Sequence, residues 1–355
     1  MRTTLSVLVL RQFPDLEDRA AHEQYKAQVL REGALVCARA RTSNYRPHSL
    51  GLSIKMAFGG REDYLIDGRW RSVDDDVYMI INAGHDYSSR IESLDPVLSV
   101  AVMFPQRMVD SALQYLMRSP EHVLESPAER MPAPIFEEHL RPHDPIVSPC
   151  LKYIASMCEK GSADDEWYEE QAHFLLERLL RRGHADQVEI ERLGKARRRT
   201  RLEIYRRVNR ASDYLLSCYD QPLTLGALAD VACLAPHYFL HVFKAVRGHT
   251  PFEFLTCKRL AVALRLLARG GETTAEIAEQ VGFAGRDRLH RACRRYVKTA
   301  PAACRKLFAA DRDDVTGVPD LRQMLSRDAT QSAARSSLGQ EHARRGRAPR
   351  EIIEP

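Results

Sequence analysis

The chain has 355 residues, of which 44% are hydrophobic and 28% are charged, and its formal net charge is +5. This length allows two domains with their own cores, and the composition is that of an ordinary soluble protein. Past the start of the chain, no stretch approaches the roughly 18 consecutive apolar residues of a membrane-spanning helix, so no membrane partner is expected.

The start of the chain and its cysteines agree with a cytoplasmic protein. The apolar stretch before Arg11 is interrupted and lacks a small-residue cleavage site, which predicts a first β-strand instead of a secretory signal. The eight cysteines never form a Cys-x-x-Cys motif; they are Cys37, Cys150, Cys158, Cys218, Cys233, Cys257, Cys293 and Cys304. In a chain of this size we expect free thiols that act as small buried hydrophobes in a reducing cytoplasm.

The positive charge is concentrated in one segment of the chain. Residues 205–308 carry 17 Lys and Arg against 8 Asp and Glu, whereas residues 1–204 carry 28 against 32 and residues 309–355 carry 8 against 8. Neutralising phosphates releases counterions, so a compact basic segment is typical of a module that binds a polyanion. The acidic part then fits a separate sensing module.

Alternating apolar and polar residues predict β-structure over residues 49–104. Residues 52–58 show the period of a half-buried strand. Asp67-Gly68 lies between two short apolar runs and predicts a hairpin with a type I′ turn, in which both central residues need positive φ. Further short strands are expected over 77–81, 87–91 and 97–104. The series predicts a small antiparallel barrel or sandwich.

After the strands the pattern changes to that of helices. Apolar residues recur three and four apart over 108–117, 149–158 and 164–180, which predicts helices that flank the strands. The stripe on the last of them packs either on its own domain or on a second subunit. The charged segment 184–204 predicts an interdomain linker. Residues 309–355 lose apolar periodicity and predict a largely disordered tail.

Residues 223–305 repeat themselves weakly with a period near 50. Leu228-Ala229-Asp230 corresponds to Ile277-Ala278-Glu279, and Pro251 corresponds to Pro301. The offset is 49 before the turn and 50 after it, so the second copy has one extra residue between its two helices. Each copy predicts a short helix, a tight turn and a second amphipathic helix, which is the helix-turn-helix arrangement.

Local signals mark where these helices begin and end. Thr273 with Glu276 forms a capping box, Gly282 ends the first helix of the second copy, and Gly285 opens its second helix. Pro236 suits the first position of the second helix in the first copy. Between the copies, Thr250-Pro251 begins a helix that ends at Gly270-Gly271. Its continuous apolar stripe, Leu255, Leu260, Ala263, Leu264 and Leu267, predicts a rigid spacer.

The second helix of each copy divides into an apolar and a polar face. The inward residues are Phe239, Val242, Phe243 and Val246 in one helix, and Leu289, Ala292, Cys293 and Tyr296 in the other. The outward residues, predicted to bind DNA, are His237, Leu240, His241 and Lys244, and Arg286, Asp287, His290, Arg291 and Arg294. Arg and His suit guanine acceptors, and Lys and further Arg suit phosphates. Two such helices can enter successive major grooves about 34 Å apart.

The repeat resembles the AraC/XylS family of transcription regulators. The residues that carry the resemblance are Leu228-Ala229, Phe239, Phe243-Lys244, Gly248-His249-Thr250-Pro251, Arg259-Leu260, Ala263, Leu266-Leu267, Ile277-Ala278, Val281-Gly282-Phe283, Arg291, Arg294 and Pro301. The resemblance implies an α+β multidomain protein. Its parts would be a cupin-like antiparallel β-barrel domain with flanking helices over 1–183, a linker, and an all-α domain with two helix-turn-helix units joined by a spacer helix over 205–308.

The second copy departs from the family pattern at several positions. Leu289 and Cys293 replace the usual aromatic core pair, Lys298 replaces a turn glycine, and Cys304 replaces a tyrosine. In the first copy Ala235 replaces the usual Ser cap. Losing a cap costs on the order of 1 kcal/mol, and smaller core residues cost more unless neighbours refill the space. The second unit is therefore expected to be the less stable one.

The β-rich domain offers candidate effector-binding residues but no catalytic pattern. Arg46, His48, Tyr64, His85 and Tyr87 lie on or near predicted strands and could line the mouth of a barrel. The spacing of a metal-binding cupin is absent, as are a phosphate loop, a dinucleotide fingerprint and a nucleophile elbow. We expect no metal, no cofactor and no enzymatic activity.

The sequence thus predicts a sequence-specific regulator that binds double-stranded promoter DNA at the nucleoid and whose N-terminal barrel binds a small-molecule effector. A homodimer is expected, and an activator would also contact RNA polymerase. The alternative is a ligand-independent regulator whose N-terminal domain only oligomerises. A fused enzyme is disfavoured by the missing catalytic patterns.

Overall fold

The computed structural model describes residues 7–14, 18–117, 135–161, 164–194, 197–308 and 319–326. They form two compact units, which divide between Val246 and Arg247. The disordered tail predicted over 309–355 lies outside the described residues except for 319–326. There, residues 321–326 are helical, Asp320 and Gln323 cap each other's backbone N–H groups, and Leu321 and Met324 are buried.

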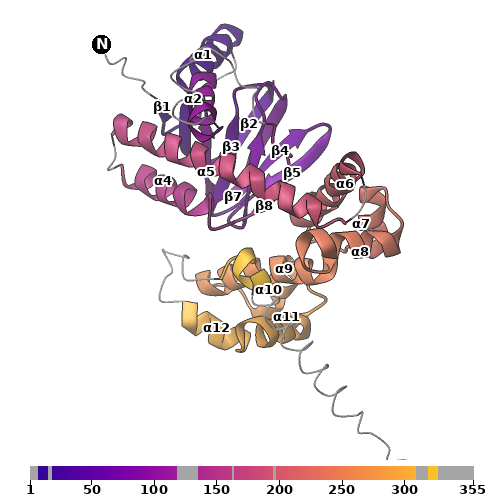
Figure 1. Cartoon of the computed structure of the whole chain (residues 1–355). Helices are drawn as coiled ribbons and strands as arrows, with labels where there is room; N and C mark the ends of the chain where they lie inside the picture. The colour runs from indigo at the N-terminus through magenta and orange to yellow at the C-terminus, as the bar shows by residue number, and fades with distance from the viewer. Residues whose placement is uncertain are drawn as a thin grey trace, which may run out of the picture. The chain divides into compact units, whose positions relative to one another are not determined.

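The first unit is built on one eight-stranded sheet (Figure 1). Its strands are β1 (Leu8–Leu10), β2 (Ala34–His48), β3 (Ser53–Phe58), β4 (Glu62–Ile66), β5 (Arg69–Val73), β6 (Val77–Ile81), β7 (Tyr87–Met103) and β8 (Leu140–Pro142). The strand order is β1-β2-β7-β3-β6-β8, and β4 pairs with both β5 and β7. The two long strands, β2 and β7, therefore organise the sheet.

The sheet corrects the prediction of a closed antiparallel barrel. In the described part of the chain the strand order ends at β1 and β8 without a pairing that joins them, so the sheet is not closed. It is also mixed, because β1 pairs with β2 in parallel. Parallel neighbours need a crossover, and α1 (Arg19–Glu32), capped by Asp18, supplies it. Alternation in a sequence predicts strands but not closure, which depends on tilt and register between strands.

The predicted hairpin at Asp67-Gly68 is confirmed. Residues of β4 and β5 pair from Glu62 with Val73 to Ile66 with Arg69, which leaves these two residues as the turn. Their φ values are 52° and 70°, the positive values that a type I′ turn requires. The turn sequence alone therefore set the register of this pair.

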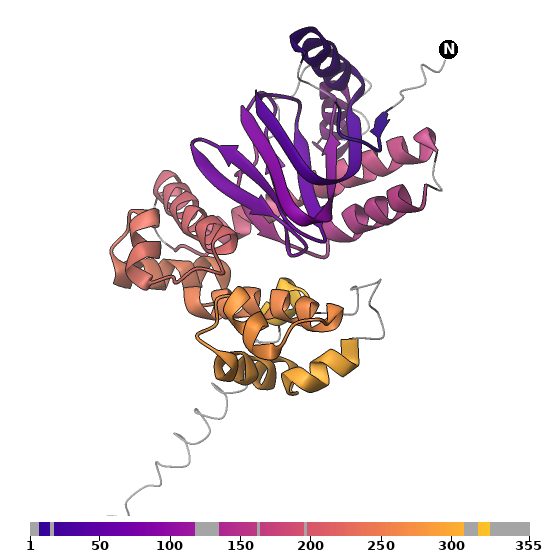
Figure 2. The ribbon, with the colours of Figure 1, turned by 180° about the vertical axis from the view of Figure 1, so that it is seen from behind.

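Helices cover one face of the sheet. They are α2 (Gln106–Met117), α4 (Ser148–Lys160) and α5 (Asp165–Glu191), and they share a core with Ile54, Met56, Val100 and Val102 of the central strands. Figures 1 and 2 show the two faces, with α4 and α5 in front of the sheet in one view and behind it in the other. On the opposite face, Val36, Ala101 and Met103 pack with Val29 of α1.

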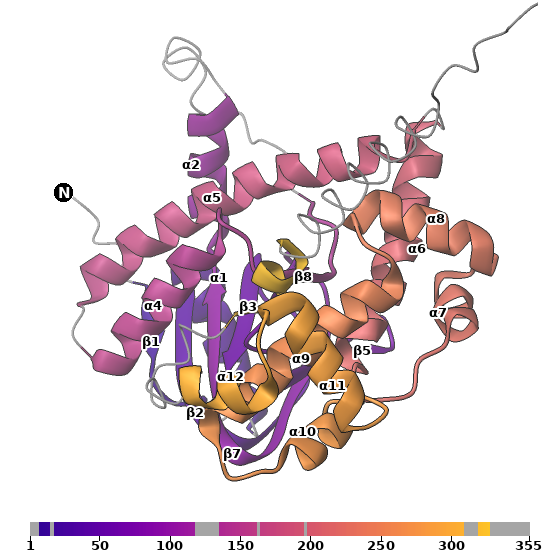
Figure 3. The same cartoon turned by 90° about the horizontal axis from the view of Figure 1, so that it is seen from below.

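The structure differs from the predicted linker over 184–204. Helix α5 continues to Glu191 as one long helix (Figure 3), and α6 (Arg198–Ser217) follows after a short connection. One charge of this segment is buried and paired: Asp186 contacts Arg141, which is 1% exposed, at 2.7 Å and Arg182 at 3.0 Å. The ion pair with Arg141 holds the second half of α5 on the sheet domain.

Helix α6 belongs to the same compact unit as the sheet, although residue 205 was predicted to begin the DNA-binding domain. The Asp213 carboxylate accepts hydrogen bonds from the Arg71 guanidinium at 3.1 Å and from the Leu140 backbone at 2.8 Å. The unit continues through α7 (Leu225–Ala232) and α8 (Pro236–Arg247). Helix α8 begins at Pro236, as predicted.

The second unit consists of α9 (Pro251–Arg269), α10 (Thr274–Gln280), α11 (Arg286–Ala292), the π-helical turn η1 (Cys293–Val297) and α12 (Pro301–Phe308), followed by residues 321–326. The apolar stripe predicted on α9 is buried, and α10 and α12 pack against this helix. The capping box of Thr273 and Glu276 is present, as are the positive φ of Gly282 and the N-terminal position of Gly285.

No single helix among the described residues is long and apolar enough to cross a membrane. Helices α7 and α8 together have the length and apolar composition of a membrane span, but the two helices are bent by 78° relative to each other.

The helices of the two copies of the repeat end with the same backbone conformation. A left-handed residue follows the first helix in both, Cys233 with φ 52° directly after α7 and Gly282 with φ 80° after Val281, and the next N–H bonds back to Ala229 or Ala278. The second helix also ends on a left-handed residue in both copies, Gly248 with φ 77° and Lys298 with φ 64°.

Lys298 is expected to weaken the second copy. A left-handed backbone costs a side chain with a Cβ roughly 1 kcal/mol or more, and glycine avoids this cost. Lys298→Gly should raise the free energy of unfolding by about 0.5–1 kcal/mol, measured by denaturant melts.

The matched control is the reverse change in the first copy. No atom lies within 4 Å of a Cβ built at Gly248, so Gly248→Lys should cost only the backbone strain and lower stability by a similar amount. A Lys298→Gly protein that is no more stable than the wild type would contradict this account.

Candidate nucleic-acid interface and ligand pocket

Helix α8 presents a polar face to solvent because its apolar stripe is buried. Phe239, Val242, Phe243 and Val246 are each at most 4% exposed, and the first and third of them pack edge to face at 5.5 Å between ring centroids. On the other side, His237, His241 and Lys244 are exposed and Leu240 is half-buried. The inward and outward faces lie where the sequence placed them.

Helix α11 and the η1 turn repeat this arrangement with different residues. Leu289, Ala292, Cys293 and Tyr296 are buried. The exposed residues are Arg286, Asp287, Arg291 and Arg294, and His290 is half-buried. The thiols of Cys293 and Cys304 hydrogen-bond with each other, so these two departures from the family pattern meet in one place.

Burial is the same at every position of the two helices. Residues 236–247 and 286–297 show an identical series of exposed, half-buried and buried positions. This correspondence brings out two residues that the sequence analysis missed, Tyr238, which is 45% exposed, and Arg288, which is exposed at the equivalent position. The offset of 50 residues was the signal that would have found them.

The outward face of α11 is strongly cationic. Within the described residues, none of Arg286, Arg288, Arg291 and Arg294 forms an ion pair with a carboxylate; Arg291 reaches only the Asp287 carbonyl, at 3.4 Å. Asp287 lies in the first turn of α11, where the helix dipole stabilises a negative charge. Arginine forks that are free of carboxylate partners are suited to phosphate oxygens and to the acceptor edge of guanine.

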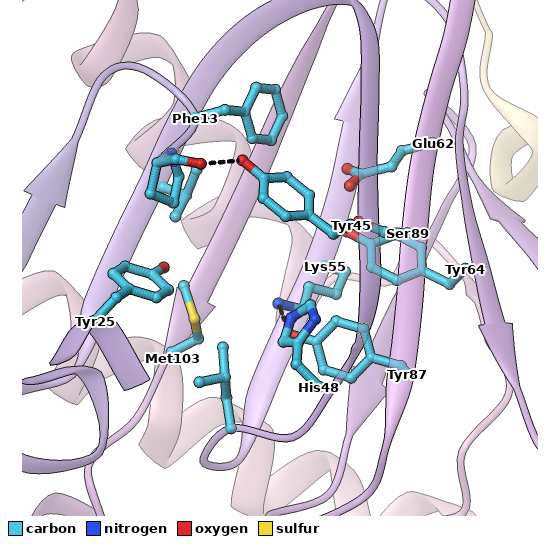
Figure 4. A pocket seen from close by; sticks show the side chains of 13 residues that line it. Phe13, Tyr25, Tyr45, His48, Lys55, Glu62, Tyr64, Tyr87, Ser89 and Met103 are labelled. Atoms are coloured by element: carbon cyan, nitrogen blue, oxygen red, sulfur yellow. Dashed lines mark hydrogen bonds between the residues drawn. The ribbon is translucent and has the colours of Figure 1, made fainter. Parts of the chain in front are cut away.

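The sheet domain contains a small pocket on the face away from α4 and α5 (Figure 4). Its volume is about 50 Å³, and aromatic and polar side chains of β2, β3, β4 and β7 line it. The Lys55 ammonium donates to the Tyr87 hydroxyl at 3.0 Å, and Ser99 donates to Glu62 at 2.6 Å. The His48 ring lies 4.4 Å from the Tyr87 ring, centroid to centroid.

Burial dominates the electrostatics of this pocket. It lowers the pKa of Lys55 to about 8 and the pKa of His48 to about 4, and it raises the pKa of Glu62. The buried ammonium and carboxyl also attract each other, which offsets part of this cost. The pocket can therefore offer a small polar ligand one cationic donor, one carboxyl group and several phenols.

Three of the five predicted effector residues meet in this pocket: His48, Tyr64 and Tyr87. The Arg46 side chain is exposed and does not line it. His85 lies elsewhere, hydrogen-bonded to Glu138 and, at 3.0 Å, to Asp67.

The sequence analysis missed Lys55 and Glu62, which form the charged part of the pocket. Lys55 follows Ile54 in a strand whose alternation placed it on the solvent side. That side is the pocket face. The signal in the sequence that could have found Lys55 was its position between two apolar residues of the strand, Ile54 and Met56.

No group of three or more His, Cys, Asp or Glu side chains within the described ranges is arranged to hold a metal ion. All eight cysteines are free thiols. Five of them are buried, as expected of small hydrophobes, while Cys233 is exposed at the left-handed end of α7.

The segment that contains both helix pairs is similar to known DNA-binding proteins. Residues 228–307 match the family described as a helix-turn-helix domain. An AraC-like transcription regulator of Streptomyces lividans is 36% identical over 83 residues, which are 23% of this chain and 27% of the relative. The HTH-type transcriptional activator RclR of Escherichia coli K12 is 32% identical over 83 residues, which are 23% of this chain and 29% of the relative.

Among solved structures, the DNA-binding domain of AdpA in complex with a target DNA aligns with 30% of this chain and 96% of its own length, at 25% identity and a TM-score of 0.29. The chain spans less than a third of the length of the two curated relatives named above. Residues 228–307 are therefore similar to a helix-turn-helix domain and to a segment of AraC-like transcription regulators.

The pocket makes a prediction about pH. Since the pKa of Lys55 is lowered from 10.5 to about 8, the unfolded chain holds a proton between these values that the folded chain has lost. Stability should therefore rise with pH over this interval, relative to Lys55→Met, which cannot titrate. Urea melts at a series of pH values measure the difference. Lys160→Met, at an exposed lysine, should behave like the wild type; an unchanged pH profile for Lys55→Met would disprove the buried ammonium.

Proposed function

We propose that this chain is a sequence-specific regulator of transcription that binds double-stranded promoter DNA through α8 and α11. The observation that carries the proposal is the identical burial series of residues 236–247 and 286–297 inside the segment matched to a helix-turn-helix domain. Two copies of a repeat that expose the same helix positions are suited to two similar sites on one DNA duplex. The protein then acts at the nucleoid, in the cytoplasm.

In this proposal each second helix enters a major groove. Arg286, His290 and Arg291 of α11 contact base edges, and Arg294 and Lys244 contact phosphates. On α8, His237 and His241 donate to base acceptors while Leu240 packs on a thymine methyl group. The net positive charge of residues 205–308 supports the phosphate contacts and makes binding sensitive to salt.

The proposal assigns effector binding to the pocket around Lys55. Its support is the meeting of three sequence-predicted residues with a buried ammonium and carboxyl in one cavity. A ligand that binds only the folded state stabilises it, and such a ligand can shift the order or orientation of the helices that follow.

A second candidate role for the sheet domain is ligand-independent oligomerisation. Tyr153 of α4 is 52% exposed and Phe174 of α5 is 48% exposed, so the helices that cover the sheet carry large apolar side chains at their surface. A homodimer that uses these helices would need no effector. An activator would in either case also contact RNA polymerase.

The DNA contacts are tested by alanine substitutions. Arg286→Ala and Arg291→Ala should each weaken binding to a cognate site by about 1–3 kcal/mol and should barely change affinity for unrelated DNA. Electrophoretic shifts with selected genomic fragments measure both affinities. Arg269→Ala, at an exposed arginine at the end of α9, is the control and should change neither. Equal losses on all sequences would reassign both side chains to phosphates.

The sensor role is tested by a thermal-shift screen with metabolites on the full chain. The expected result is a compound that raises the melting temperature of the wild type and not of Lys55→Met. If no compound does so, and promoter activity survives deletion of residues 1–190, the domain is not a sensor. A purified sheet domain that remains monomeric at high concentration would count against the oligomerisation role.

A further inference from the structure

A second and larger cavity lies in the first unit, where α6 packs against β5. Its volume is about 510 Å³, against about 50 Å³ for the pocket around Lys55, and it is within the range of small-ligand sites. Charged side chains form most of its wall. None of the residues predicted to bind an effector lines it except His85.

Arg71 of β5 is a buried cation in this cavity that has an unused donor. The residue is 6% exposed, and its Nε donates to the Asp213 carboxylate at 3.1 Å. The other oxygen of that carboxylate accepts from the Leu140 backbone, so both oxygens of Asp213 have a donor. The Nη1 of Arg71 is buried and has no hydrogen-bond partner among the described residues. A buried donor left in this state costs roughly 1–3 kcal/mol, and this cost is recovered only when an acceptor reaches it.

A second arginine extends this donor surface. Arg69 lies two residues before Arg71 on the same strand, so both side chains leave the same face of β5. Arg69 is exposed, lines the cavity, and has no ion pair or hydrogen bond within the described residues. The two guanidinium groups can therefore act on one ligand.

The carboxylates of the cavity are already engaged. Glu137 accepts two hydrogen bonds from Arg206, both at 2.8 Å, and Glu138 accepts from the Asn82 backbone at 2.6 Å and from His85. The groups that lack a partner are thus donors, and the missing partner is an acceptor. At the same time the five carboxyl groups of the lining, those of Asp67, Glu137, Glu138, Glu203 and Asp213, outnumber its four arginines, and this balance disfavours a ligand with two or more negative charges.

We propose that this cavity is a binding site for a small hydrophilic monocarboxylate, whose carboxylate oxygens accept hydrogen bonds from Arg71 and Arg69. The planar guanidinium fork matches the two oxygens of a carboxylate. The polar wall suits a ligand that carries hydroxyl groups, as in a hydroxy acid. A phosphate would bring close to two charges at neutral pH and would be repelled by the surrounding carboxyl groups.

The site joins two elements that the DNA-binding segment depends on. Helix α6 contributes Asp213 to the cavity, and from its other side Arg207 donates to the Cys233 carbonyl at 3.0 Å, in the turn between α7 and α8. A ligand that links β5 to α6 would fix the helix that supports α7. This regulatory consequence rests on the proposed function, whereas the binding itself does not.

The test is isothermal titration of the full chain, without DNA, with gluconate, glycerate and lactate as monocarboxylate probes. Inorganic phosphate, succinate and glycerol are the comparison probes. At least one hydroxy acid should bind saturably and raise the melting temperature, and glycerol should not bind. If none of the three hydroxy acids binds, or if phosphate or succinate binds more tightly than all of them, the proposal is overturned.

Three variants locate the site. Arg71→Lys keeps the charge beside Asp213 but removes the fork, and Arg69→Gln changes an exposed side chain, so the second variant decides the matter if the first does not fold. Each should weaken the hydroxy acid by roughly tenfold or more, the scale of one charged hydrogen bond. Arg41→Gln, at an exposed arginine of β2, should bind as the wild type does.

Two further results decide between cavities. Lys55→Met should keep its affinity for the hydroxy acid; a loss there would move the ligand to the small pocket and overturn the assignment. Wild-type affinity in Arg69→Gln and in a folded Arg71→Lys would overturn it as well. Because no DNA is present, these outcomes are independent of whether the chain regulates transcription.

Discussion

The proposed interface with DNA depends on the burial of four apolar side chains on each of two helices. Once Phe239, Val242, Phe243 and Val246 are buried, the geometry of the helix fixes which residues face solvent. The second copy buries Leu289, Ala292, Cys293 and Tyr296 at the same positions and so exposes the same ones. The faces are set by position, and the chemistry of the exposed residues is free to differ between the copies.

Paired charges determine how far the first unit extends. Arg141 with Asp186, and Arg71 with Asp213, are ion pairs between residues that are each less than a tenth exposed. Removing one partner of such a pair would leave a buried charge and would cost several kcal/mol. These pairs link the end of α5 and the helix α6 to the sheet.

The two cavities of this unit differ in what they leave unsatisfied. Around Lys55, the ammonium already has the Tyr87 hydroxyl as a hydrogen-bond partner and the Glu62 carboxyl nearby. Beside α6, the carboxylates are engaged and two guanidinium groups have donors to spare. A ligand for the first must be small and polar, and a ligand for the second must bring acceptors.

The sequence determined several features that depend on near neighbours in the chain. It determined the hairpin at Asp67-Gly68, the helix ends at Pro236, Thr273 and Gly282, the buried stripe of α9, and the inward and outward faces of α8 and α11. These features follow from φ preferences, capping and helical periodicity, which act over a few residues. The repeat added the family resemblance, because a copied unit keeps the same positions buried.

Only the tertiary structure decided what depends on residues far apart. The open, mixed sheet required the pairing of β1 with β2 across α1, and strand alternation alone is the same in an open sheet and a barrel. The sequence placed Lys55 on the solvent side of its strand, whereas in the structure residues of β2, β4 and β7 line a pocket around it. Arg71 meets Asp213 across 142 positions, and a periodic pattern within a single helix or strand gives no information about a partner at that distance.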